Sequence, residues 1–185
     1  MIIADTNVVA EVMKASPAQV VVSWLNDQET STLFLTSITI GEIRYGLRIM
    51  PQGRRRLQLE QGFERILIEA FAGRVLPFDE EAVRHYGEVM GRRKEIGRPM
   101  GVLDGQIASI ARANGCAVAT RNVKHFVECG VEIINPSAID ASLFTRTSPA
   151  PAAPGTPCDR ARRRRYRFPT RRRSGSGWLC GRPRP

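Results

Sequence analysis

Short apolar runs alternate with longer amphipathic segments along the first 147 residues. The short runs fall at 2–4, 33–36, 74–76, 116–119 and 132–134, and they have the length and composition of buried strands. Strands that alternate with helices are typical of a parallel sheet flanked by helices. The pattern therefore predicts an α/β fold with about five strands.

Five helices are expected between these strands. Ser16, Ser37 and Asp79 stand where helices would begin, and their side chains can cap a helix start. Apolar residues recur at helical spacing over 59–70. A further helix is expected over 102–114 and would end at the glycine that follows it.

The excess of positive charge lies at the C-terminal end of the chain. Of the 28 basic and 18 acidic residues, 11 arginines and one aspartate fall in 148–185, which leaves 17 of each sign in 1–147. The part expected to fold is therefore neutral overall. Net charge does not indicate a nucleic-acid-binding domain.

The organisation of the chain changes near Ser148. Residues 1–143 have the length and apolar content of one globular domain. Residues 148–185 are rich in Pro, Gly and Arg and have no apolar period, so this tail is expected to be disordered. Two interpretations stay open for it: a functional basic tail that binds RNA or DNA with strong salt dependence, or an adventitious segment.

The cysteines and histidines form no pattern of a metal site or a disulfide framework. Four cysteines occur without a C-x-x-C pair, and His85 and His125 have no partner at metal-ligand spacing, so both histidines are expected to be structural. No apolar stretch has the length of a membrane span or the layout of a signal peptide. These features predict a protein of the reducing cytoplasm without membrane association.

Three acids and one amide are expected at the same edge of the sheet. Asp5 follows the first strand, and Asn122 follows the fourth. Glu42 lies early in the helix after the second strand, and Asp104 lies early in the helix that leads to the fourth. Ligands of open α/β sheets bind beyond the carboxyl ends of the strands. We therefore expect these four oxygen-bearing side chains to converge.

Two of the acids have apolar neighbours at helical spacing. Asp104 shares its helix face with Ile107, and Glu42 shares its face with Tyr45 and Ile49. A carboxylate among apolar neighbours is costly unless it is paired or binds a metal. A set of carboxylates without His or Cys favours Mg²⁺ or Mn²⁺ over zinc.

Each acid also has an ordinary structural explanation. An Asp after a strand, such as Asp5, is usually a turn or a helix cap, and a Glu within a helix, such as Glu42, usually faces solvent. Asp104 near a helix start is favoured by the helix dipole. Only the convergence of these residues favours a metal site over these explanations.

The acids lie within four longer motifs that occur in order over about residues 1–140. The motifs contain the segments Asp5-Thr6-Asn7, Gly41-Glu42-Ile43-Arg44, Leu103-Asp104-Gly105 and Thr120-Arg121-Asn122. Together they resemble the motifs of PIN-domain ribonucleases, especially the VapC/FitB-like toxins of bacterial type II toxin–antitoxin systems. Each motif is weak alone, and the four together are specific.

The resemblance implies a PIN-like, doubly wound parallel sheet and an Mg²⁺- or Mn²⁺-dependent endoribonuclease. It also implies a homodimer that cleaves cellular RNA and is inhibited by a cognate antitoxin. Asp5 and Asp104 would bind the metal, and Glu42 would bind it or accept the proton of the attacking water. Asn122 takes the fourth catalytic position, where the family often has Asp.

Four further residues are expected to support the site. Thr6 and Asn7 would orient the carboxylate of Asp5, and Thr120 would bond water at the metal. Arg121 would contact an RNA phosphate. The sequence fits equally well with Arg121 as an ordinary surface residue before a turn.

Two other functional classes remain as alternatives. A non-catalytic PIN-like module would bind RNA or an antitoxin without cutting, although an inert domain needs none of the three acids. A phosphoryl-transfer fold of the haloacid-dehalogenase type requires Asp-x-Asp after the first strand, where this chain has Asp5-Thr6-Asn7. P-loop and dinucleotide folds require a glycine fingerprint that this sequence lacks.

Overall fold

Five parallel strands form the sheet of the protein, in the order β3-β2-β1-β4-β5. The computed structural model describes residues 1–138 and 166–168. The strands are β1 (Ile2–Ala4), β2 (Leu33–Thr36), β3 (Val75–Leu76), β4 (Ala117–Ala119) and β5 (Ile133–Ile134). The predicted sheet of about five parallel strands is confirmed.

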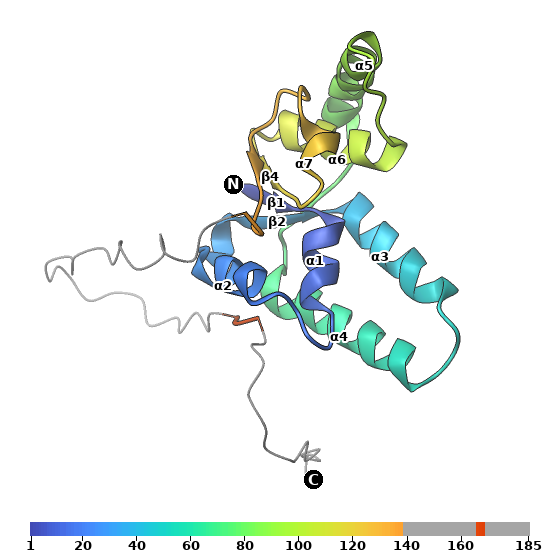
Figure 1. Ribbon diagram of the computed structural model, residues 1–185, viewed down its shortest axis with the longest axis vertical. Coiled ribbons are helices and arrows are strands. Elements are labelled where there is room, and N and C mark those ends of the chain that lie inside the picture. The colour runs from blue at the N-terminus through green and yellow to red at the C-terminus, as the bar shows by residue number, and fades with distance from the viewer. Residues whose placement is uncertain (139–165, 169–185) are drawn as a thin grey trace, which may run out of the picture.

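Helices form the connections between the strands and cover both faces of the sheet. They are α1 (Thr6–Val12), α2 (Gln19–Asp27), a short 3-10 helix η1 (Thr30–Thr32), α3 (Ser37–Ile49), α4 (Arg54–Ala70), α5 (Glu80–Glu95), α6 (Val102–Ala113) and α7 (Val123–Phe126). Helices α1 to α4 lie on one side of the sheet, and α5 to α7 lie on the other (Figure 1). The fold is therefore doubly wound, as expected.

Successive strand residues divide between two cores, one on each face of the sheet. In β1, Ile3 packs in the core of α5 to α7, and Ala4 packs in the core of α1 to α4. In β4, Val118 and Ala119 divide in the same way. Side chains of a strand alternate between its faces, so a strand covered on both sides reads as a continuous apolar run. This explains why the strands were recognisable from the sequence.

Helix α1 is missing from the sequence prediction. It directly follows β1 and has only seven residues, four of them buried, so its apolar residues show no clear helical period. Helix α2 begins at Gln19 and not near Ser16, and its N-cap Ala18 makes no side-chain cap bond. The N–H of Ala18 donates instead to Glu11 Oε1 at 3.0 Å. A tertiary contact replaces the local cap there.

The starts of α3, α5 and α6 agree with the prediction or differ by one residue, whereas α4 begins at Arg54, five residues before the predicted apolar period, and the short α7 was not predicted. Thr36, and not Ser37, caps α3, because the Thr36 hydroxyl accepts the N–H of Thr39 at 3.0 Å. Asp79 caps α5 as predicted and accepts the N–H of Ala82 at 3.0 Å. Helix α6 ends just before a glycine with a φ of 60°, which is the left-handed conformation that glycine adopts cheaply.

The C-terminal part of the chain is described at 166–168, which lie against α2 and α4 (Figure 1). The predicted domain end at 143 and the rest of the predicted tail, 148–185, lie outside the described residues. Among the described helices, none combines the length and the apolar composition that a membrane crossing requires.

Candidate active site

The order of the sheet reverses between β1 and β4. The chain runs from β1 outward to β2 and β3 on one side, and from β4 to β5 on the other. Ala4 pairs with Ala119, and the N–H of Asp5 donates to the Ala119 carbonyl at 3.0 Å. The carboxyl ends of these two strands therefore bring Asp5 beside Thr120, at the usual ligand position of an open α/β sheet.

Asp5 is a buried carboxylate with fixed hydrogen-bond partners. It is 3% exposed, and its Oδ1 accepts the N–H of Thr6 at 2.7 Å as the N-cap of α1. Its Oδ2 accepts the side-chain amide of Asn7 at 2.6 Å and the hydroxyl of Thr120 at 2.7 Å. These three donors set the orientation of the carboxylate, and they come from both strands that flank the reversal point.

The environment of Asp5 raises its pKa from the usual 3.8 to about 6. Burial is the main cause, because removal from water disfavours the charged form. The hydrogen bonds from Thr120 and Thr6 lower the pKa, and the negative charges of Asp104 and Glu42 raise it. Asp104 and Glu42 are therefore close enough to disfavour the negative charge of Asp5, and a cation beside Asp5 would stabilise its ionised form.

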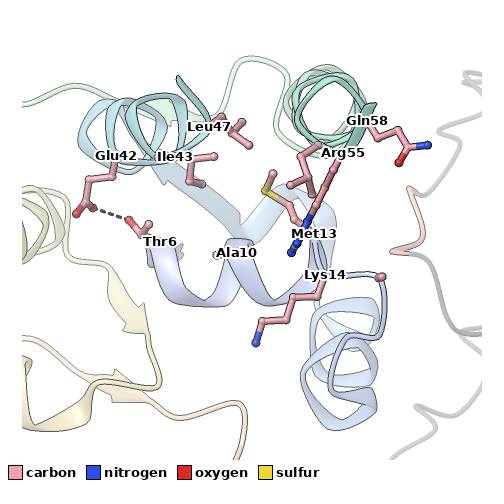
Figure 2. Close-up of a pocket in the computed structure, with 12 residues that line it drawn as sticks. Thr6, Ala10, Met13, Lys14, Glu42, Ile43, Leu47, Arg55 and Gln58 are labelled. Atoms are coloured by element: carbon pink, nitrogen blue, oxygen red, sulfur yellow. Dashed lines mark hydrogen bonds between the residues drawn. The ribbon is translucent and has the colours of Figure 1, made fainter. Parts of the chain in front are cut away.

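Glu42 reaches the site from α3 through Thr6. The Thr6 hydroxyl donates to Glu42 Oε2 at 2.6 Å (Figure 2). The prediction that Glu42 lies among apolar neighbours that are themselves covered is wrong, because Tyr45 and Ile49 on its helix face are 68% and 65% exposed. The buried stripe of α3 runs through Ile43, one position further along the helix. Sequence spacing defined the face correctly, but only packing decides which face is covered.

Asp104 enters the site from the first turn of α6. Its Oδ2 lies 2.8 Å from Nδ1 of His125, and its side chain is 24% exposed. The rest of its helix face is covered as expected, with Ile107 fully buried. His125, expected from the sequence to be purely structural, lies on α7 beside the carboxylate. No spacing rule connects positions 104 and 125, because the fold alone brings them together.

Thr120 connects Asp5 to the loop after β4. The side-chain amide of Asn7 donates to its hydroxyl at 3.0 Å, and the N–H of Asn122 donates to the same hydroxyl at 3.0 Å. Asn122 stands at the N-cap position of α7, and its side chain makes no cap bond. The structure thus brings Asn122 to the same edge of the sheet as Asp5, through its backbone.

Arg121 pairs with a buried acid that the sequence interpretation overlooked. Glu11 of α1 is 4% exposed and accepts from Arg121 at 2.6 Å, from Lys14 at 2.5 Å and from the N–H of Ala18 at 3.0 Å. The hydrogen bond from Lys14 is the largest of the effects that lower the pKa of Glu11. The available signal was an acid inside the otherwise apolar run at 8–12. The expected phosphate contact of Arg121 stays a prediction.

The three carboxylates suit a hard divalent cation by their chemistry. All the candidate donors are oxygens, which Mg²⁺ and Mn²⁺ prefer. Within residues 1–138 and 166–168, no three acidic, His or Cys side chains lie close enough to form a ready-made metal cluster. Glu42 is bonded to Thr6, and Asp104 contacts His125. Joint binding therefore requires these two side chains to rotate toward Asp5.

A family model, the PIN domain, matches residues 2–128, a span that includes Asp5, Glu42, Asp104 and Asn122. The chain belongs to the PIN domain family. The PIN-like fold expected from the four motifs is confirmed by this match.

The PIN domain of this chain is similar to several bacterial proteins. VapC ribonuclease Y4jK of Sinorhizobium fredii is 45% identical over 136 residues, which cover 74% of this chain and 97% of that protein. Toxin FitB of Neisseria gonorrhoeae is 34% identical over 136 residues, which cover 74% and 98%. The crystal structure of FitAcB from the same organism matches with a TM-score of 0.71 at 33% identity, covering 75% of this chain and 100% of that one. The resemblance to VapC/FitB-like proteins is confirmed.

Proposed function

We propose that this PIN-domain protein is a divalent-metal-dependent endoribonuclease and the toxin of a toxin–antitoxin pair. The observation that carries the proposal is the placement of Asp5, a buried carboxylate at the reversal point of the sheet whose pKa is raised partly by Asp104 and Glu42. The capping of α1 explains Asp5 itself but not the two acids near it, because a helix cap needs no acidic neighbours. The relatives named as a ribonuclease and as a toxin support the reaction and the biological role.

In this proposal, Asp5 and Asp104 hold Mg²⁺ or Mn²⁺, and Glu42 either holds it with them or accepts the proton of the attacking water. The cation, when bound, polarises the phosphate and lowers the pKa of water at the site. Asn7 and Thr120 keep the Asp5 carboxylate oriented by the hydrogen bonds described above. Positioning of this kind is a large part of nuclease catalysis, because the reacting groups must be aligned before charge develops.

Two neighbouring groups act through these acids. Thr6 keeps Glu42 within reach of Asp5, and His125 restrains the Asp104 side chain. Asn122 supplies an uncharged amide at the fourth position, so at most three carboxylates would hold the cation. We place the nuclease in residues 1–143 and treat 148–185 as lying outside the catalytic domain.

A cognate antitoxin and a second copy of the chain are the proposed protein partners. The similar solved structures include the crystal structure of FitAcB from Neisseria gonorrhoeae and a structure of FitAB bound to a DNA fragment. The exposed Tyr45 and Ile49 of α3 offer a surface for a homodimer. The free, buried thiol of Cys116 is compatible with the reducing cytoplasm.

The test is an endonuclease assay on a mixed pool of single-stranded and structured RNA, with Mg²⁺, with Mn²⁺ and with EDTA. Asp104→Asn removes one charge with little change in shape, and we expect cleavage to fall on the order of 100-fold or more. Asp27→Asn is the matched control, because Asp27 is exposed at the end of α2. The control should cleave like the wild type.

The main alternative is a PIN-domain module that binds RNA or an antitoxin without cutting it. Metal-independent cleavage, or equal cleavage by Asp104→Asn and the wild type, would contradict the proposed site. Binding of RNA without cleavage of any member of the pool, by a folded protein that binds Mg²⁺, would favour the non-catalytic module.

A further inference from the structure

Phe168 is buried in the core that α1 to α4 form on one face of the sheet. It is 4% exposed and belongs to the buried cluster that also contains Trp24 of α2 and Phe63 and Ile66 of α4. An aromatic side chain that removes this much apolar surface from water is a large stabilising contact. Residues 166–168 are thus docked on the domain, far along the chain from the elements they touch.

Backbone recognition adds to this burial. The N–H of Phe168 donates to Asn26 Oδ1 at 2.8 Å, and Asn26 Nδ2 donates to the Phe168 carbonyl at 3.4 Å. Tyr166 packs edge-on against Phe168, with 5.0 Å between ring centroids and 89° between ring planes. Burial also raises the pKa of the Tyr166 hydroxyl. Asn26 therefore holds both hydrogen-bonding groups of one residue, as a sheet neighbour would.

The docked segment has no counterpart in the family pattern. The PIN domain match ends at residue 128, and the 136 residues matched to the Sinorhizobium protein already cover 97% of it. That relative has almost no further length for such an element. The segment is thus a feature that this chain has and the Sinorhizobium relative lacks.

A groove connects the docked segment to the candidate active site. Near the site, it is lined by Thr6 and Glu42, and Figure 2 shows this part between α1, α3 and α4. Further along, its lining includes Tyr166 and Arg167. The two parts share lining residues of α1 and α4, namely Met13, Lys14, Gln58 and Leu59. The docked segment therefore forms the far wall of a groove that begins at a catalytic acid.

The lining of this groove carries three arginines and Lys14 against two acids, Glu42 and Glu69. Arg55, Arg65 and Arg167 line it, and all three are exposed. Within the described parts of the chain, none of them has an acidic group within salt-bridge distance, whereas Arg56 and Arg121 are both paired. A guanidinium without a carboxylate partner is suited to phosphate oxygens.

We infer that Arg167 binds an RNA phosphate beyond the site of cleavage. The docking of residues 166–168 against α2 and α4 holds Arg167 at the end of the groove, where it can make this contact. The inference rests on the proposed ribonuclease function. Met13 and Leu59 give the groove an apolar floor, and Arg55, Arg65 and Arg167 supply positive charge along it. A single RNA strand offers this combination of a charged backbone and apolar base faces.

The test measures binding of a fluorescent single-stranded RNA of mixed sequence to the full chain, in EDTA, over a range of KCl concentrations. Arg167→Gln should weaken binding several-fold and lower the slope of log affinity against log salt by about 0.7, which corresponds to one lost phosphate contact on a single strand. Phe168→Ala keeps the charge but removes the anchor, so it should weaken binding in the same direction. Phe168→Leu should restore part of the loss. Arg92→Gln on α5 is the matched control for loss of one exposed arginine.

Thermal unfolding of the same variants tests the docking itself. Phe168→Ala should lower Tm by several degrees, since it empties a buried aromatic site, and Arg167→Gln should leave Tm unchanged. An unchanged Tm in Phe168→Ala would overturn the docking. A lowered Tm with RNA binding like the wild type, or equal binding by Arg167→Gln and Arg92→Gln, would overturn the phosphate role.

Failure of this inference differs from failure of the proposed function. If the wild type cleaves RNA with Mg²⁺ and Arg167→Gln matches the Arg92→Gln control in binding, the nuclease stands and the Arg167 contact is wrong. If the wild type cleaves nothing but Arg167→Gln shows the smaller salt slope, the groove binds RNA and the nuclease proposal is wrong.

Discussion

Asp5 is held in a position where its negative charge is costly in the absence of a cation. Its carboxylate is buried, and the hydrogen bonds from Thr6, Asn7 and Thr120 offset only part of the cost, because the pKa remains raised to about 6. Such a group binds protons, and metal ions, more tightly in the folded state than in the unfolded chain.

This cost predicts a pH dependence of stability for the metal-free protein. The unfolded chain loses the proton of Asp5 near pH 3.8 and the folded chain near pH 6, so between these values the folded state binds more protons. The contribution of Asp5 to the free energy of unfolding therefore decreases as pH rises through this window, by roughly 3 kcal/mol in total. Urea unfolding in EDTA at several pH values should show it.

The matched variant for this measurement is Asp5→Asn, which cannot ionise. The difference in unfolding free energy between wild type and Asp5→Asn should fall between about pH 4 and pH 6 and be constant above pH 7. A difference that stays constant over the whole range would mean that Asp5 ionises as easily in the fold as in water.

Glu11 is the second buried acid, and its partners are cations. It accepts hydrogen bonds from Arg121, Lys14 and the backbone of Ala18, so its charge is compensated. Glu11→Gln should lower the free energy of unfolding by about 1–3 kcal/mol, because it weakens three contacts of a buried group at once. Chemical denaturation measures this loss. Glu64→Gln is the control, since its pair with Arg44 is half exposed and should contribute under about 0.5 kcal/mol.

At the scale of elements, side chains of α5 pack closely over Gly105 of α6. A side chain added at Gly105 would meet the sulfur of Met90 at 2.4 Å and the ring of Tyr86 at 3.2 Å. The sequence shows only that Gly105 lies in the third motif. The close approach of two helices, and not a backbone conformation, explains this glycine.

Two glycine-to-alanine variants separate packing from helix propensity. Gly105→Ala should lower the free energy of unfolding by about 1–3 kcal/mol, because Met90 and Tyr86 must move. Gly87→Ala, on the exposed face of α5 with nothing within 4 Å, should raise it by about 0.5–1 kcal/mol. Equal effects of the two variants in chemical denaturation would show that α5 and α6 do not pack this closely.

At the scale of the whole molecule, the candidate active site takes its residues from both halves of the fold. Asp5 and Glu42 come from the side of α1 to α4, and Asp104 and His125 come from the side of α5 to α7. A cation shared by these acids would therefore link the two cores across the sheet.

Mg²⁺ should accordingly stabilise the wild-type fold as a whole. At a Mg²⁺ concentration 100 times its dissociation constant, the free energy of unfolding should rise by about 2.7 kcal/mol, since the unfolded chain has no assembled site. Thermal unfolding with and without Mg²⁺ measures this effect without any RNA. Asp104→Asn should lose most of the gain, and Asp27→Asn should keep it. The same gain in all three proteins would place the cation elsewhere.

The sequence alone predicted the five strands, the longer helices and the candidate residues of the site. Alternating apolar runs predicted the five strands, because strands covered on both faces show continuous apolar residues. Four motifs named the candidate acids, and the carboxyl ends of parallel strands lie at one edge of the sheet, where a site is expected. Short elements escaped, because α1 has too few residues for a helical period. The start of α2 was also misplaced, because no side chain caps this helix and Glu11 instead accepts the N–H of Ala18.

Only the tertiary structure decided which faces are buried and which distant residues touch. It left the helix face of Glu42 exposed, brought His125 against Asp104, and docked Phe168 between α2 and α4. Spacing along one helix defines its faces but not the neighbour that covers each of them. Contacts between residues far apart in sequence depend on how all the elements pack together, and no local pattern records that.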